Sequence, residues 1–143
     1  MVVAPRVELQ AEVDGRRADL FALVSTADGL RRWLDDAEFE ATVGRPCRFV
    51  LGDAVAVGKV LAVSPPQHVS VSWDWEGEPL ATPSVVAFDL IDHGKRTHLT
   101  LRHVGLADRG QRELHEAMWR HWFGRLVDAT APPIRPGPVA GRP

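Results

Sequence analysis

Alternating apolar and polar residues near the start of the chain predict a β-strand over residues 6–14. Val7, Leu9, Ala11 and Val13 share one face of this segment, and charged or amide side chains occupy the other. Successive side chains of a strand point to opposite faces of a sheet, so this pattern is typical of a strand with one buried face. The first predicted element is therefore a half-buried strand.

Two short amphipathic helices are predicted next. Residues 20–24 place their apolar side chains at the 3.6-residue spacing of a helix, and residues 27–36 do so again, with Trp33 on the inward face. Ser25 or Thr26 precedes the second helix. Either residue is suited to cap it, because Ser and Thr accept hydrogen bonds from the free N–H groups of a first helical turn.

Several strand candidates follow, separated by turn residues. Apolar alternation and β-branched runs predict strands over residues 47–52, 54–64, 68–75, 84–92 and 96–105. Consecutive strands joined by tight turns run antiparallel. Beyond them, an apolar pattern with the helical period predicts a long helix over residues 110–129, which ends before two prolines.

These elements together predict an α+β fold. An antiparallel sheet needs a cover on its apolar face, and the long C-terminal helix has the length to provide it. We therefore expect a curved antiparallel sheet of six to seven strands, with two short helices after its first strand, wrapped around the C-terminal helix. Residues 1–131 are predicted to form this domain, and the Pro/Gly-rich residues 132–143 a flexible tail.

Composition and charge narrow the class of protein. The 143 residues carry a net charge of -2, which argues against a nucleic-acid binder because such proteins need a concentrated positive field. No apolar run reaches the roughly 20 residues of a membrane span, and the N-terminus lacks the pattern of an export signal. Cys47 is the single cysteine, so neither an intrachain disulfide nor a Cys-rich zinc site is expected. These features predict a cytoplasmic protein.

Three stretches, residues 58–66, 68–73 and 97–106, carry a resemblance to a known family. Their sequence resembles the activator-of-Hsp90-ATPase-homologue family, which includes small stand-alone bacterial members. This family belongs to the START-like, or Bet v 1-like (SRPBCC), superfamily of helix-grip proteins. The similarity extends in order over residues 6–128. It implies the same α+β architecture that the patterning predicts.

The resemblance also implies a cavity between the concave sheet and the long helix, where superfamily members hold lipids, sterols, polyketide intermediates or hormones. We accordingly expect a small apolar or aromatic ligand there, and no cofactor. Met118 stands where the family often has glycine, so its flexible thioether is expected to occupy part of this space. The candidate cavity-lining residues are Trp33, Phe49, Val71, Trp73, Phe88, Leu99, Leu101, His103, Met118, Trp119 and Trp122.

Among these candidates His103 offers the most chemistry, because alternation places it on the same strand face as Leu99. An inward imidazole is either a base or ligand handle, or a core histidine whose nitrogens are paired internally. His98 falls on the opposite strand face, and the six residues between His115 and His121 direct these two rings apart on the helix. A metal site would have to join different elements, and none is predicted.

Two further features have alternative interpretations. Asp74 and Glu76, followed by Glu78, surround Trp75 and form either a solvated hairpin end or a cavity mouth that selects a cationic molecule. In the second case Trp75 would offer a cation–π face. Cys47 shares a strand face with apolar residues and is expected to be a buried, unreactive thiol.

Three functions follow as hypotheses. The first is a START-like protein that binds a small hydrophobic or aromatic molecule. The second is a module that binds a chaperone or another protein, for which an exposed apolar patch of several hundred Å² is expected. The third, an enzyme of cyclase or hydrolase type, needs a second polar group beside His103 and is not favoured. Nucleic acid and membrane are not expected partners, and monomer and homodimer both stay open.

Overall fold

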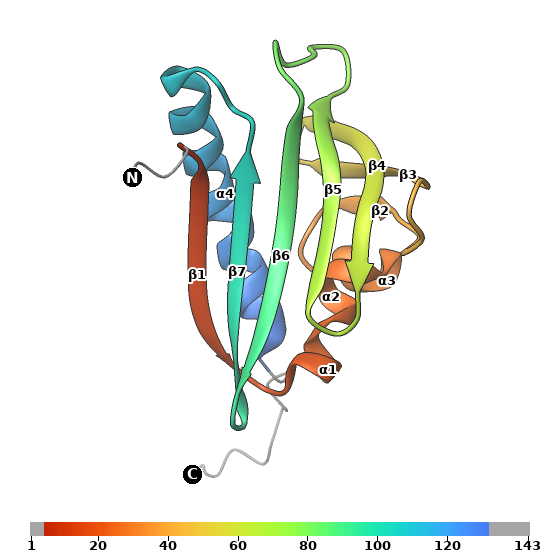
Figure 1. The fold of residues 1–143 in the computed structure, drawn as a ribbon, viewed down its shortest axis with the longest axis vertical. Coiled ribbons are helices and arrows are strands. Elements are labelled where there is room, and N and C mark those ends of the chain that lie inside the picture. The colour runs from red at the N-terminus through yellow and green to blue at the C-terminus, as the bar shows by residue number, and fades with distance from the viewer. Residues whose placement is uncertain (1–4, 132–143) are drawn as a thin grey trace, which may run out of the picture.

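A seven-stranded antiparallel sheet curls around one long helix in the computed structural model, which describes residues 5–131 (Figure 1). The strand order is β1-β7-β6-β5-β4-β3-β2, so the first strand pairs with the last. The strands are β1 (Val7–Asp14), β2 (Asp36–Glu38), β3 (Pro46–Leu51), β4 (Ala54–Ser64), β5 (His68–Trp75), β6 (Ser84–His93) and β7 (Arg96–Val104). The helices in the described residues are α1 (Arg17–Leu20), α2 (Ala22–Ser25), α3 (Ala27–Leu30) and α4 (Arg109–Thr130).

The predicted α+β helix-grip fold is confirmed. All six strands expected from the apolar pattern form, and their ends differ from the expected ones by no more than one residue. Alternation works well here because one face of each strand is buried and the other meets water. The long helix also forms, one residue longer at each end than its pattern indicates.

The region between β1 and β3 is where the local predictions were wrong. The first helix is broken at Phe21 into α1 and α2. The second, α3, is capped by Thr26, whose hydroxyl accepts from the Gly29 N–H at 2.9 Å, but it ends at Leu30. The chain then turns so that Trp33 is buried, with 1% exposure, and enters the short strand β2, which was not expected. Tertiary packing here overrides the helical pattern.

The apolar core lies between the concave face of the sheet and α4 (Figure 1). The strand register brings like residues together: Leu101 pairs with Leu9 on one side and with Phe88 on the other. Trp119 and Leu126 of α4 close this layer, each 1% exposed. Burial of one such large side chain stabilises the fold by about 1.5–3 kcal/mol.

A glycine allows β4 to approach β5 closely. A Cβ atom on Gly58 of β4 would lie 1.8 Å from the Ser72 carbonyl oxygen, so only glycine allows this approach of β4 to β5.

The β5–β6 loop and the start of α4 lie at one end of the molecule, and the β6–β7 turn lies at the other (Figure 1). A site beside the start of α4 and a site beside the β6–β7 turn would therefore lie at opposite ends of the molecule.

Two further predictions concern the ends of the chain and membranes. The expected tail over residues 132–143 lies outside the described residues. The division into a domain and a tail therefore stays a prediction. Within residues 5–131, no helix has both the length and the apolar character to cross a lipid bilayer.

Candidate functional site

An open groove of about 890 Å³ lies at the end of the molecule where α4 begins. Its lining comes from three places: the β3–β4 turn with the start of β4, the end of β5 with the loop after it, and the first turns of α4 with the segment before them. The apolar part of the lining includes Trp75, Leu80, Leu106, Leu114 and Met118. These positions are distant in sequence, and the β5–β6 hairpin and the β7–α4 connection bring them together.

Trp75 and His115 form a hydrogen-bonded pair within this lining. The Trp75 indole N–H donates to His115 Nε2 at 2.9 Å, and His115 Nδ1–H donates to the Gln111 carbonyl oxygen at 2.7 Å. An indole only donates and a carbonyl only accepts, so the neutral ring carries its proton on Nδ1. Burial lowers the pKa of His115, against the opposing effect of the Gln111 carbonyl. His115 is therefore a neutral ring with both nitrogens occupied.

The charged side chains that line the groove are acidic. Asp53, Glu76, Glu78 and Asp108 contribute carboxylates, and no lysine or arginine belongs to the described lining. Glu76 also lies 3.6 Å from a guanidinium nitrogen of Arg48, which offsets part of its charge. A concave site of one sign attracts molecules of the opposite sign. The groove is accordingly suited to a cation.

The acidic cluster predicted after Trp73 is divided between two roles. Glu76 and Glu78 line the groove, as the cavity-mouth interpretation required. Asp74 instead fixes the loop, because its Oδ1 accepts from the main-chain N–H groups of Trp75 at 2.9 Å and Leu80 at 2.7 Å. Asp53 and Asp108 were not expected in this site, since no local pattern links them to the cluster.

The interior between the sheet and α4 is filled by aromatic side chains. Trp73 stacks on Phe49 at 5.4 Å between ring centroids and lies 5.1 Å from Trp119. About 20 Å³ of free space is left beside them, which is room for about one water molecule. The predicted ligand space between sheet and helix is thus closed in this conformation.

The eleven candidate residues therefore lie in different places. Met118 alone among them lines the groove. The small interior void is bordered by Trp33, Phe49, Val71, Trp73, Phe88 and Trp119, and a second void of about 10 Å³ by Leu99. Leu101, His103 and Trp122 are buried and line none of these spaces. A role for these buried residues in ligand binding stays a prediction.

His103 lies at the centre of a buried polar chain. The Trp119 indole N–H donates to His103 Nδ1 at 3.0 Å, so the ring proton is on Nε2 and donates to Ser84 Oγ, also at 3.0 Å. The Ser84 hydroxyl in turn donates to the Trp73 carbonyl oxygen at 2.6 Å. Burial, and secondarily His115, lowers the pKa of His103 from 6.5 to about 3. This geometry is that of the core histidine, with no free lone pair for acid–base chemistry.

Cys47 is buried on β3, as expected, with 4% of its surface exposed. Burial raises the pKa of its thiol to about 11. The thiolate is the reactive form of cysteine, and it is scarce at neutral pH under these conditions. The thiol acts as a small apolar group in the core.

A curved antiparallel sheet that grips a C-terminal helix, with an opening beside the start of that helix, defines a START-like helix-grip protein. Residues 14–131 match the family described as activator of Hsp90 ATPase homolog 1-like protein. This match covers most of the chain. The chain belongs to this family.

Solved structures share the fold at low sequence identity. A protein from Mesorhizobium loti superposes with a TM-score of 0.78 and 22% identity, covering 87% of this chain and 96% of that one. The Aha1 dimer from Colwellia psychrerythraea gives 0.73 and 19%, over 88% and 96%. An Hsp90 activator from Plasmodium falciparum gives 0.71 and 18%, over 85% and 92%. No curated protein matches the chain significantly.

Proposed function

We propose that this protein binds a small aromatic or apolar molecule that carries a positive charge, in the groove between the β5–β6 loop and the start of α4. Membership of the family supports a START-like ligand-binding role or an Hsp90 activator-like role. The groove favours the first, because it combines apolar walls with four carboxylates. Its volume of about 890 Å³ falls in the range of about 300–1,000 Å³ typical of small-molecule sites.

Different lining residues would contact different parts of the ligand. The Trp75 ring offers a flat surface for stacking and for a cation–π contact, which contributes about 0.5–2 kcal/mol. Leu114 and Met118 provide apolar contacts, and the unbranched Met118 side chain adapts to irregular shapes. Glu76 and Glu78 orient the positive group. Stacking therefore supplies affinity, and the carboxylates supply the choice of charge.

A deeper position for the same ligand is supported by the contact between Trp75 and Trp73. These rings pack edge to face at 5.5 Å, with Trp75 on the groove and Trp73 on the interior void. The Trp73 indole N–H is buried without a hydrogen-bond partner among the described residues. An unpaired buried donor costs about 1–3 kcal/mol, which an acceptor on a ligand would recover. Movement of Trp75 would bring the predicted interior residues into contact with the ligand.

The experiment is a fluorescence titration that follows the summed emission of the five tryptophans, of which Trp75 lines the groove. A planar cationic dye such as acridine orange and the anionic anilinonaphthalenesulfonate are compared, with the expectation that only the cation saturates. The double variant Glu76→Gln, Glu78→Gln should weaken the cation about fivefold, at roughly 0.5 kcal/mol for each exposed charge pair. Saturable binding of the anion alone, or of neither probe, would refute the proposal.

A matched control separates a local effect from the overall field. Glu113 and Glu116 lie on α4, outside the groove lining, and their replacement by glutamine removes the same total charge. This control variant should leave the affinity for the cationic dye within twofold of the wild-type value. An equal loss of dye affinity in both variants would show that the dye responds to the overall charge and not to Glu76 and Glu78. This result would contradict binding in the groove.

A protein-binding role is the second candidate, and the filled interior favours it, because a module without a guest needs no cavity. The large apolar side chains with substantial exposure lie on separate segments: Val43, Leu61, Ile91, Val104 and Leu114. Stimulation of the ATPase rate of purified Hsp90 by this chain, with no effect of the Glu76 and Glu78 substitutions, would support this role over the first.

A further inference from the structure

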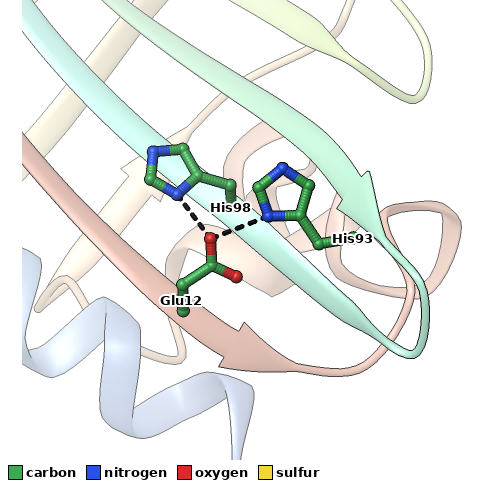
Figure 2. Close-up of side chains that lie close together, drawn as sticks. All are labelled: Glu12, His93 and His98. Carbon is green, nitrogen blue, oxygen red and sulfur yellow. Dashed lines mark hydrogen bonds and ion pairs between the residues drawn. The ribbon is translucent and has the colours of Figure 1, made fainter.

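Three side chains from different strands meet on the outer face of the sheet, near the β6–β7 turn (Figure 2). Glu12 on β1 is paired with His98 on β7, and His93 ends β6. The Nδ1 atoms of His98 and His93 lie 2.7 Å and 2.9 Å from the same oxygen, Glu12 Oε1. One donor atom from each residue can be chosen so that all three lie within 4.8 Å of one another.

We propose that Glu12, His93 and His98 bind a divalent transition-metal ion of the zinc class. Two imidazole nitrogens and one carboxylate oxygen form a ligand set typical of zinc sites that leave a position open for water. Zinc binds such atoms at about 2.0–2.2 Å, which places tetrahedral ligands about 3.3 Å apart. The donor atoms of Glu12 and each histidine are slightly closer than this, so each histidine must move a little away from Glu12 to admit the ion.

The ion would take the place of the protons that now point from the rings toward Glu12. Metal ligation requires each imidazole to present a lone pair, so the Nδ1 protons leave to solvent as the metal binds. Strand pairing holds the backbone of all three residues in place: Glu12 is paired with His98, and His93 with Arg96. The rings of His93 and His98 already lie face to face, with centroids 5.6 Å apart.

A second shell of contacts orients His98. Its Nε2 lies 3.1 Å from Gln10 Oε1, and the Gln10 amide nitrogen donates to the carboxylate of Glu8. The Gln10 oxygen must therefore face the ring, and it accepts the Nε2 proton. A ligating histidine typically donates its other N–H to such an acceptor, which fixes the ring and directs its free nitrogen at the metal.

The surrounding charge is compatible with a cation. Arg96 is the guanidinium in contact with this cluster, and it donates to the main-chain carbonyl of Glu12 at 3.1 Å. Its charge is opposed by Asp14, whose carboxylate lies 3.2 Å away. Glu8 lies further along the same face of β1, where its carboxylate is paired with Arg6 and Arg102. The guanidinium beside the cluster is therefore offset by a carboxylate of its own.

The test is calorimetric titration of the tag-free full chain with zinc chloride at about pH 7.5, with magnesium chloride in parallel. Zinc should bind at one site for each chain, and magnesium should give no saturable heat because it prefers oxygen ligands. His98→Ala or His93→Ala should weaken zinc at least about 100-fold. Gln10→Ala, which removes only the second-shell contact, should weaken it about tenfold.

His68 provides the control, since its Nδ1 lies 2.8 Å from Asp89 Oδ1 on the same sheet, away from the cluster. His68→Ala should leave zinc affinity unchanged. All these substitutions are at exposed or half-buried positions, and circular dichroism verifies that each variant is folded. The proposal is overturned if the wild-type chain gives no saturable zinc binding, or if the double variant His93→Ala, His98→Ala binds as tightly as the wild type.

Discussion

Acidification is predicted to destabilise the protein through His103, and the substitution His103→Leu should remove this effect. The ring is fully buried, and its pKa is lowered from 6.5 to about 3, first by burial and second by His115. The unfolded chain exposes the same ring to water, where it takes up a proton at about pH 6.5. Between these two values the unfolded state binds more protons than the folded state.

The sign and the size of the effect follow from this difference. The free energy of unfolding falls as the pH falls, by up to about 1.4 kcal/mol per pH unit for one proton. From about pH 7.5 to about pH 5 the loss due to His103 is about 2 kcal/mol, and it reaches about 4 kcal/mol at the folded-state pKa. The pKa of His115 is lowered as well, so this residue adds a loss of the same sign.

Urea unfolding followed by tryptophan fluorescence at these two pH values measures the effect. At neutral pH His103→Leu should cost about 1–3 kcal/mol, because the Trp119 indole N–H loses its acceptor. Near pH 5 the gap to the wild type should narrow by about 2 kcal/mol, since contributions from carboxylates cancel in the difference. The exposed His121 provides a control: His121→Ala should keep the wild-type slope. Parallel pH dependence in wild type and His103→Leu would refute the reasoning.

A second variant keeps this prediction testable if His103→Leu unfolds. The double substitution His103→Leu, Trp119→Phe removes both the acceptor and the donor of the buried hydrogen bond. Replacing both partners costs less than leaving one unpaired, so part of the stability lost in the single variant should return. The double variant also lacks the titrating ring, so a pH dependence equal to that of the wild type would contradict the reasoning without any measurement on the single variant.

Three further outcomes are expected. Gly29→Ala should destabilise the fold by about 3 kcal/mol, because the new Cβ atom would lie 1.9 Å from a carbonyl oxygen of α2. Gly124→Ala should stabilise the fold by about 0.5–1 kcal/mol, because Gly124 lies in α4 with open space around its Cα atom. Chemical denaturation measures both changes. Trp75→Phe should cost about 1–2 kcal/mol in the same assay, since His115 Nε2 loses its donor. Cys47 should resist a disulfide-exchange reagent until denaturant unfolds the chain, and rapid labelling of the native protein would show that its thiol is not buried.

Much of the fold could be predicted because the sheet has one wet and one dry face. The alternation of apolar and polar residues predicted that His103 points toward the core, and it also predicted the strand limits. The strand β2 was not predicted, because its three residues, Asp36–Glu38, are too few to show a period. Partial filling of the interior by Met118 was expected, but the closure comes instead from the contact of Trp73 on β5 with Trp119 on α4. No local pattern encodes the distance between those two elements.

The same limit applies to the two candidate sites. Glu76 and Glu78 were visible as a cluster, but Asp108 joins them only through the packing of α4 beside the hairpin. His93 and His98 flank one turn, and their common partner Glu12 comes from the other end of the sequence. Only the register of β1 with β7 reveals that partner. Sites assembled across strands therefore need the pairing, which composition and spacing do not supply.

The filled interior restricts the class of guest that this member of the family can hold. A free volume of about 20 Å³ accepts neither an acyl chain nor a sterol ring, whereas the open groove exposes one side of any ligand to water. A small-molecule site usually buries about 70–90% of a drug-sized ligand, and a one-sided groove buries less. For a ligand in the proposed groove position, with Trp75 in place, affinity would come from stacking on Trp75 and from charge rather than from enclosure. This reasoning favours a compact, flat cation over a lipid, and it makes binding sensitive to salt.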